Sequence, residues 1–119
     1  MSAKVFVPQV PSRFDSGIGA WVPIVDLSPA RRYGEIVTIL PPGAYRMDPK
    51  ALEQVIGSAL DGISANDWIL AAGDPAIMGM TMAMAAFRLG GALRVLRWNK
   101  QVHKYDEVVI SLKTKQEAA

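Results

Sequence analysis

The stretch at residues 66–91, NDWILAAGDPAIMGMTMAMAAFRLGG, decides the fold class of this chain. Trp68–Ala72 is a short apolar run of the kind that forms a strand covered on both faces. Asp74 then supplies an N-cap and Pro75 a first helical residue, so the Met- and Ala-rich segment behind them is expected to be a helix. A strand followed at once by a helix is typical of α/β proteins.

A second strand and helix precede this stretch. Ile36–Leu40 is a β-branched apolar run that ends at a Pro-Pro-Gly turn, which predicts another buried strand. Asp48 and Pro49 repeat the helix start, and Gly62 is expected near the helix C-terminus. The apolar residues between them recur at helical spacing, at Leu52, Val55, Ile56, Ala59, Leu60 and Ile63.

The two ends of the chain complete the pattern. GALRVLRWNKQ and KYDEVVISLK predict two strands joined as a hairpin around Lys100–His103. In the first third, KVFVPQV and WVPIVDL are expected to be short strands kept at sheet edges by their prolines. PSRFDSGIGA between them is typical of a turn, and SPARRYGE predicts a short helical turn with Ser28 as N-cap and Gly34 as its stop.

We therefore expect a single α/β domain over residues 1–119. Its form would be three-layer-like, with a mostly parallel sheet of four to six strands, two main helices and a C-terminal β-hairpin. Ile36–Leu40 and Trp68–Ala72 would lie near the centre of the sheet. Residues 1–34 would form an irregular N-terminal arm with short edge strands, and residues 113–119 a frayed tail.

Composition excludes several kinds of chemistry. The chain has no cysteine and a single histidine, His103, so thiolate sites are impossible and His-based catalysis would depend on one side chain. No G-x-S-x-G or H-E-x-x-H pattern occurs. Asp26, Asp67 and Asp74 could meet at one sheet edge, but each has a turn or capping role. We expect a non-enzymatic protein without catalytic residues, cofactor or metal.

No membrane role is expected either. The longest mostly apolar stretch, Ala76–Phe87, is well short of the roughly 20 residues that a bilayer needs, and the N-terminus does not resemble a signal peptide. These features, with the absence of cysteine, favour a cytoplasmic location.

The C-terminal hairpin is one candidate binding site. Residues 88–119 carry seven Lys and Arg against three Asp and Glu. Basic and aromatic side chains on a hairpin can track a phosphate backbone and stack on bases. The favoured interpretation is that the aromatic residues pack across the strands. The candidate nucleic-acid-binding residues are Arg94, Arg97, Trp98, Lys100, His103, Lys104 and Tyr105.

The turn before the Met-rich helix is another. Gly73, Asp74, Ala76 and Ile77 could bind a nucleotide or small anion, because helix N-termini at the carboxyl edge of a parallel sheet suit phosphate. A carboxylate at the N-cap would itself occupy these N–H groups, so we favour the capping role. The helix expected after this turn carries Met78, Met80, Met82 and Met84 on all sides, which predicts a helix packed on most of its surface.

Two resemblances bear on these sites. GDPAIMG, followed by a helix and then GG, resembles the strand–turn–helix of the nucleotide-binding LOG-type phosphoribohydrolases. Their second motif, Pro-Gly-Gly-x-Gly-Thr, has no counterpart here, so neither the activity nor a catalytic residue carries over. The frame VFVPQVPSRFD, VPIVDLSPARRYGEIVTILPPG, NDWILAAGDP and RVLRWNKQVHKYDEV resembles a group of short uncharacterised bacteriophage proteins. That resemblance implies a viral origin and the host cytoplasm, and no activity.

The sequence thus predicts a small binding or accessory protein that acts through protein contacts and self-association. The partner would be a second copy, giving a homodimer, or another protein. Dimerisation would use an exposed sheet edge or the Met- and Ala-rich helix. Nucleic-acid binding through the hairpin and ligand binding at Gly73–Ile77 are the alternatives.

Overall fold

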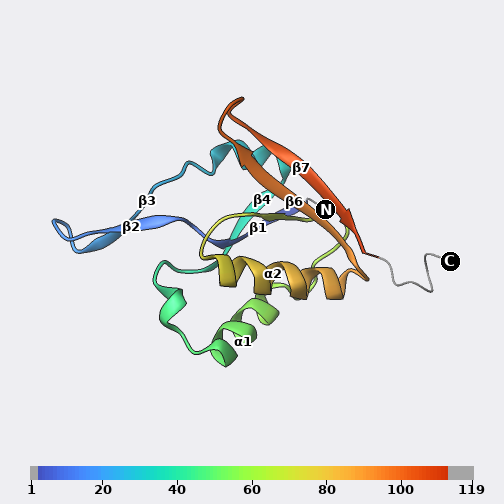
Figure 1. Ribbon diagram of the computed structural model, residues 1–119, viewed down its shortest axis with the longest axis horizontal. Coiled ribbons are helices and arrows are strands. Elements are labelled where there is room, and N and C mark those ends of the chain that lie inside the picture. Colours follow the sequence, from blue (N-terminus) through green and yellow to red (C-terminus); the bar gives the residue numbers. More distant parts are fainter. Residues whose placement is uncertain (1–2, 113–119) are drawn as a thin grey trace.

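The computed structural model describes residues 3–112. A five-stranded sheet, two α-helices, two short 3₁₀ helices and a separate two-stranded ribbon make up this part of the chain (Figure 1). The elements in chain order are β1 Lys4–Gln9, β2 Ser12–Asp15, β3 Ala20–Pro23, η1 Ser28–Tyr33, β4 Glu35–Leu40, η2 Ala44–Arg46, α1 Pro49–Ala59, β5 Trp68–Leu70, α2 Pro75–Arg88, β6 Ala92–Asn99 and β7 Lys104–Ser111.

The main sheet is mixed and has the strand order β4-β1-β5-β6-β7. β4, β1, β5 and β6 run parallel to one another, and β7 pairs antiparallel to β6 as the second strand of the C-terminal hairpin. This confirms the predicted α/β class, the mostly parallel sheet and the terminal hairpin.

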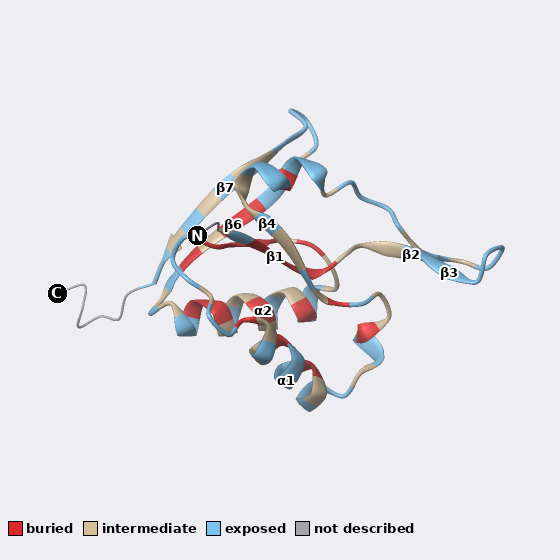
Figure 2. Cartoon of the chain, turned by 180° about the vertical axis from the view of Figure 1, so that it is seen from behind, coloured by how far each residue is buried: buried red, intermediate tan, exposed pale blue. Residues whose placement is uncertain are grey.

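The sheet is covered on both faces, as its apolar strands require. The helix face packs against α1 and α2 through a core that includes Phe6, Ile56 and Ile77. The opposite face, here called the η1 face, holds a second core with Val5 and Leu70. η1 lies over that side, and the buried residues in Figure 2 mark both layers. Two cores on one sheet account for the three-layer form.

The expectation that residues 4–10 form an edge strand is wrong. β1 lies inside the sheet, between β4 and β5. β5 is only three residues long and pairs with Val5 and Phe6, so Pro8 lies beyond this pairing, where its missing N–H breaks no contact with β5. Pro8 therefore does not force β1 to an edge.

The central position expected for Ile36–Leu40 is also wrong, because β4 forms an edge of the main sheet. Its continuous apolar run reflects coverage on two faces: Ile36 packs in the η1-face core, and Val37 and Ile39 in the helix-face core. Burial of the two faces does not report which backbone edges are paired. Trp68–Leu70 is central, as predicted.

The first third of the chain differs most from expectation. Residues 12–15, expected to be a turn, form β2, which pairs antiparallel with β3. Only residues 16–19 form the turn. The resulting β2–β3 ribbon, called the arm below, projects from the body along the longest molecular dimension of 59 Å (Figure 1). Its strands are edges of their own small sheet and not of the main one.

The helix starts follow the sequence in two cases out of three. The Asp48 carboxylate accepts a hydrogen bond from the Lys50 N–H at 3.0 Å, and Asp74 caps α2 in the same way. Ser28 is not an N-cap, because it is the first residue of η1 and Leu27 occupies the N-cap position. The Ser28 hydroxyl instead donates a hydrogen bond to the Asp26 carboxylate. Val55, placed on the apolar face of α1, is exposed.

Candidate binding surfaces

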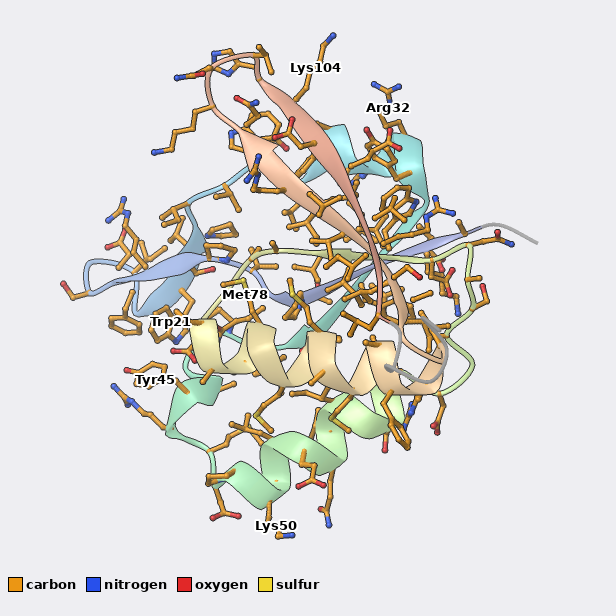
Figure 3. All side chains as sticks on the ribbon, turned by 45° about the vertical axis from the view of Figure 1, so that its right-hand side comes forward. Trp21, Arg32, Tyr45, Lys50, Met78 and Lys104 are labelled. Atoms are coloured by element: carbon orange, nitrogen blue, oxygen red, sulfur yellow. The ribbon has the colours of Figure 1, made fainter. Side chains whose placement is uncertain are left out.

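A cavity of about 510 Å³ lies at the carboxyl end of β5 on the η1 face. Open parallel sheets bind ligands at this edge. The segment between the arm and η1 forms one wall, the turn after β5 another, and Trp98 and Tyr105, near the hairpin turn, a third. Met78, labelled in Figure 3, closes it from α2. The lining residues are Pro11, Ile24, Val25, Asp26, Leu27, Pro29, Leu70, Ala71, Ala72, Gly73, Met78, Trp98 and Tyr105.

The cavity combines apolar walls with one carboxylate. Asp26 accepts hydrogen bonds from the Ser28 N–H at 2.9 Å and the Ser28 hydroxyl at 2.7 Å. These bonds hold the pKa of the Asp26 carboxyl below its usual value. Burial, and then the nearby charge of Asp26, raise the pKa of the Tyr105 hydroxyl. The cavity therefore suits an apolar group that ends in a positive charge or hydrogen-bond donor.

The turn beside the cavity is fixed by Gln9, a residue that the sequence did not single out. Its buried side-chain amide donates to the Pro41 carbonyl at 3.0 Å and accepts from the Asp74 N–H at 2.9 Å. Gly73 has φ of 110°, and a Cβ there would lie 2.6 Å from the Cβ of Gln9. Only glycine fits this backbone and this approach.

The ligand residues predicted at this turn do not form one site. The Asp74 carboxylate accepts from the Ala76 N–H at 3.0 Å and the Ile77 N–H at 3.2 Å, so the helix N–H groups already have an anionic partner. Ile77 is fully buried in the helix-face core. Of the four residues, only Gly73 lines the large cavity.

The predicted nucleic-acid residues are divided between the two faces of the hairpin. Successive strand residues point to opposite faces. Arg94 and Trp98 share the η1 face with Leu96, and Arg97 shares the helix face with Val95. Lys104 pairs with Asn99 on the same face as Arg97, while Lys100 and His103 lie in the turn. No single face collects the basic side chains of this hairpin.

Two of the arginines are held by the protein itself. The Arg94 guanidinium lies 3.8 Å from the centre of the Trp68 ring, and its nitrogen donates to the Ala65 carbonyl at 3.4 Å. Arg97 forms an ion pair of 2.8 Å with Asp106.

The aromatic side chains of the hairpin pack as the favoured interpretation expected. Trp98 lies opposite Tyr105, with ring centroids 5.0 Å apart in a T-shaped arrangement. The His103 ring lies 6.3 Å from Trp98. Exposed basic side chains remain at Lys100 in the turn, at Lys104 where β7 begins, and at the ion-paired Arg97.

The three aspartates considered as a cluster do not gather at one edge. Asp67 is at the amino end of β5, where its carboxylate accepts from the Lys4 N–H and the Ser64 N–H, both at 2.8 Å. Asp74 follows the other end of that strand. Within the described residues, no group of three His, Asp or Glu side chains is arranged to hold a metal.

The outer surface of α2 is less packed than the sequence suggested. Met80, Met82 and Met84 are half-buried against the helix-face core. Ala76, Gly79, Ala83 and Phe87 form an exposed stripe, in which Phe87 is 87% exposed. The methionines thus contribute to the core, and Ala76, Gly79 and Ala83 face outward.

The arm presents an exposed apolar surface that sequence reasoning missed. None of residues 11–29 is buried, as Figure 2 shows. Phe14 is 54% exposed and Ile18 is 68% exposed, and Ile24 and Val25 continue the apolar surface to the cavity. Two short runs joined by a Gly-containing loop were the available hairpin signal.

Trp21 ties the arm loosely to the body. Its ring is T-shaped to Phe14 at 5.6 Å and approaches Gly43, before η2. The remaining part of the arm extends into solvent.

The fold and these surfaces define a small mixed α/β protein with a projecting β-ribbon and a cavity at its sheet edge. Residues 3–112 match the model of the Phage Pam3 gp32-like protein family, and the chain belongs to that family. The match confirms the resemblance to a short bacteriophage protein family. No curated protein and no solved structure gave a match. Within residues 3–112, no helix is long and apolar enough to cross a membrane.

Proposed function

We propose that this phage protein is a non-enzymatic accessory protein that acts in the host cytoplasm through protein–protein contacts and self-association. The observation that carries the proposal is the arm, which projects from the body and carries the exposed residues Phe14, Ile18 and Trp21. A contiguous exposed apolar surface is typical of a contact site. A two-stranded ribbon is also marginally stable alone in water, so a partner would stabilise it.

The arm supports this proposal better than the exposed apolar stripe on α2. The stripe on α2 consists of small side chains with one large residue, Phe87. The arm brings two aromatic rings and a large aliphatic residue together with unpaired strand edges. Aromatic anchors contribute most of the binding energy in protein interfaces.

Light scattering coupled to size exclusion tests the proposal. We expect the full chain, over a concentration series, to reach a mass above the 12.9 kDa of one copy. Phe14→Ser combined with Ile18→Ser should return it to the monomer mass without changing the far-ultraviolet dichroism of the body. Val109→Ser, which removes a 70% exposed residue of β7, is the matched control and should leave the mass unchanged. A strict monomer at high concentration would contradict self-association.

Ligand binding in the cavity is a second candidate function. It is favoured by the apolar walls, the Trp98 and Tyr105 rings and the Asp26 carboxylate that meet there. We propose an apolar or aromatic ligand with a cationic end. In a thermal-shift series, tryptamine should raise the melting temperature of the wild type and not of Trp98→Ala, while indole acetate should have no effect. Stabilisation by nucleotides alone would favour the Gly73–Ile77 turn instead.

A further inference from the structure

One edge of the arm has backbone groups that face no partner. The Pro11 carbonyl accepts from the Ile24 N–H at 2.9 Å across the ribbon, and the Asp15 carbonyl accepts from the Gly19 N–H at 2.8 Å. Pro11 and Asp15 therefore direct their backbone groups toward β3, and so does Arg13 between them, because these directions alternate along a strand.

The remaining β2 residues, Ser12 and Phe14, must then direct their N–H and C=O groups to the outer edge. Within residues 3–112, neither residue makes a backbone hydrogen bond outside its own ribbon. The outer edge of β2 can therefore pair with another strand. Of these two residues, Phe14 is the one flanked by charged side chains on both sides.

The charges along β2 are complementary to those of a second β2 strand that runs antiparallel to it. Arg13 precedes Phe14 and Asp15 follows it. In an antiparallel pair of two β2 strands centred on Phe14, each Arg13 lies directly opposite Asp15 of the other copy. Opposite charges facing across strands stabilise the pair, and like charges destabilise it. One Asp15 oxygen accepts from the Gly17 N–H at 2.9 Å, which leaves the other oxygen for Arg13.

We propose that two copies of this chain associate by antiparallel pairing of their β2 strands about a two-fold axis at Phe14. The inference rests on the self-association proposed above and names its surface. Each Phe14 N–H donates to the Phe14 carbonyl of the other copy, and the two ribbons become one four-stranded sheet. A two-fold contact of this kind is closed, so association stops at the dimer.

The side chains on the two faces of the joined ribbon agree with this register. Phe14 lies opposite Trp21 within each arm, so the pairing sets four aromatic rings in a stripe across one face. Arg13 and Asp15 share the other face. A two-fold axis placed one residue away, at Arg13 or at Asp15, would set Arg13 against Arg13 or Asp15 against Asp15. Repulsion between these like charges opposes both alternatives.

Exchange of the two charges tests the register. Arg13→Asp alone should weaken dimerisation at least tenfold at low salt, because each new carboxylate faces Asp15 of the other copy. The double variant Arg13→Asp with Asp15→Arg should restore a large part of the affinity. Equal dimer affinity in all three proteins, measured by sedimentation equilibrium, would overturn the proposed register.

Cysteine crosslinking gives a second test that does not depend on affinity. The chain has no cysteine, so each introduced thiol can pair only with its own copy in a second chain. Residues directly opposite in this pairing have Cα atoms about 5.5 Å apart, within disulfide range. Under mild oxidation with copper phenanthroline, Phe14→Cys should give a covalent dimer. Ile18→Cys at the arm tip and Phe87→Cys on α2 are the controls and should give no covalent dimer.

The outcomes separate the two proposals. A covalent dimer from Phe14→Cys alone supports the β2 pairing. If the wild type is dimeric by light scattering and Phe14→Cys does not crosslink, the β2 pairing is wrong and self-association stands. Crosslinking of Phe87→Cys in its place would move the contact to α2. If the wild type is monomeric at all concentrations, both proposals fail.

Discussion

At the scale of single residues, Gln9 and Gly73 hold the carboxyl edge of the sheet together. Gln9 connects the segment after β4 to the start of α2 through two hydrogen bonds of its side-chain amide. The sequence indicated a turn at Gly73, but not why glycine is required. That reason lies in the close approach of Gln9, a residue 64 positions earlier, which local patterns do not encode.

Replacing Gly73 by alanine should therefore destabilise the fold. The positive φ and the Cβ contact with Gln9 together should cost roughly 2 kcal/mol or more. Gly79→Ala is the matched control, because a Cβ at this exposed helical position meets no atom within 4 Å. It should raise stability by about 0.5–1 kcal/mol. Urea unfolding of the two variants measures both effects, and equal midpoints would contradict this account.

Asp106 makes a pH-dependent contribution to the hairpin. Hydrogen bonds from Arg97 and then Asn99 hold the pKa of the Asp106 carboxyl below its usual value. A lowered folded pKa means that the stabilisation is present above the unfolded pKa and is lost as pH falls through the folded pKa. In an NMR titration, Arg97→Gln should move the Asp106 pKa upward toward its ordinary value. An unchanged pKa would show that the ion pair does not form in solution.

At the scale of elements, the sequence predicted the helices and strands whose apolar residues recur regularly along the whole element. α1, α2, β5 and the hairpin followed from periodicity and from the Asp-Pro starts at residues 48 and 74. β2 could not be recognised with the same ease, because its four residues include two charges and only one large apolar side chain. Its strand conformation depends on pairing with β3, and four residues are too few to show a clear apolar alternation in the sequence.

The role of Arg94 separates the packing and nucleic-acid interpretations of the hairpin. Loss of its contact with the Trp68 ring and its bond to Ala65 should make Arg94→Ala less stable by roughly 1 kcal/mol. The matched variant Lys100→Ala, at the exposed tip, should have little effect on stability. Chemical unfolding measures this difference. If instead both variants unfold like the wild type and weaken salt-sensitive oligonucleotide binding, the nucleic-acid alternative would be favoured.

At the scale of the whole molecule, strand order was the part of the fold that the sequence could not give. The sequence predicts strands at residues 4–9 and 35–40. Which of the two lies inside the sheet and which lies at its edge depends on crossover connections between distant segments. The cavity follows from the same topology, since it joins residues from before η1, after β5 and from the hairpin. Of the residues that line it, the sequence selected Gly73, Trp98 and Tyr105 as site candidates and considered Asp26 in the carboxylate cluster.

The arm gives the molecule its extended shape and is the centre of our account. We infer a partner from its exposed aromatic rings and its free β2 edge, since the body has two cores of its own. Residues 113–119, expected to be a frayed tail, lie outside the described residues.

Amide hydrogen exchange at residue resolution tests this account most directly. The Phe14 N–H faces the free edge, whereas the Arg13 N–H already faces β3. Raising the protein concentration through the dimerisation range should therefore slow exchange at Phe14 by at least tenfold and leave the body of the protein unchanged. Phe14 exchange that is independent of concentration while the measured mass doubles would contradict association through the β2 edge.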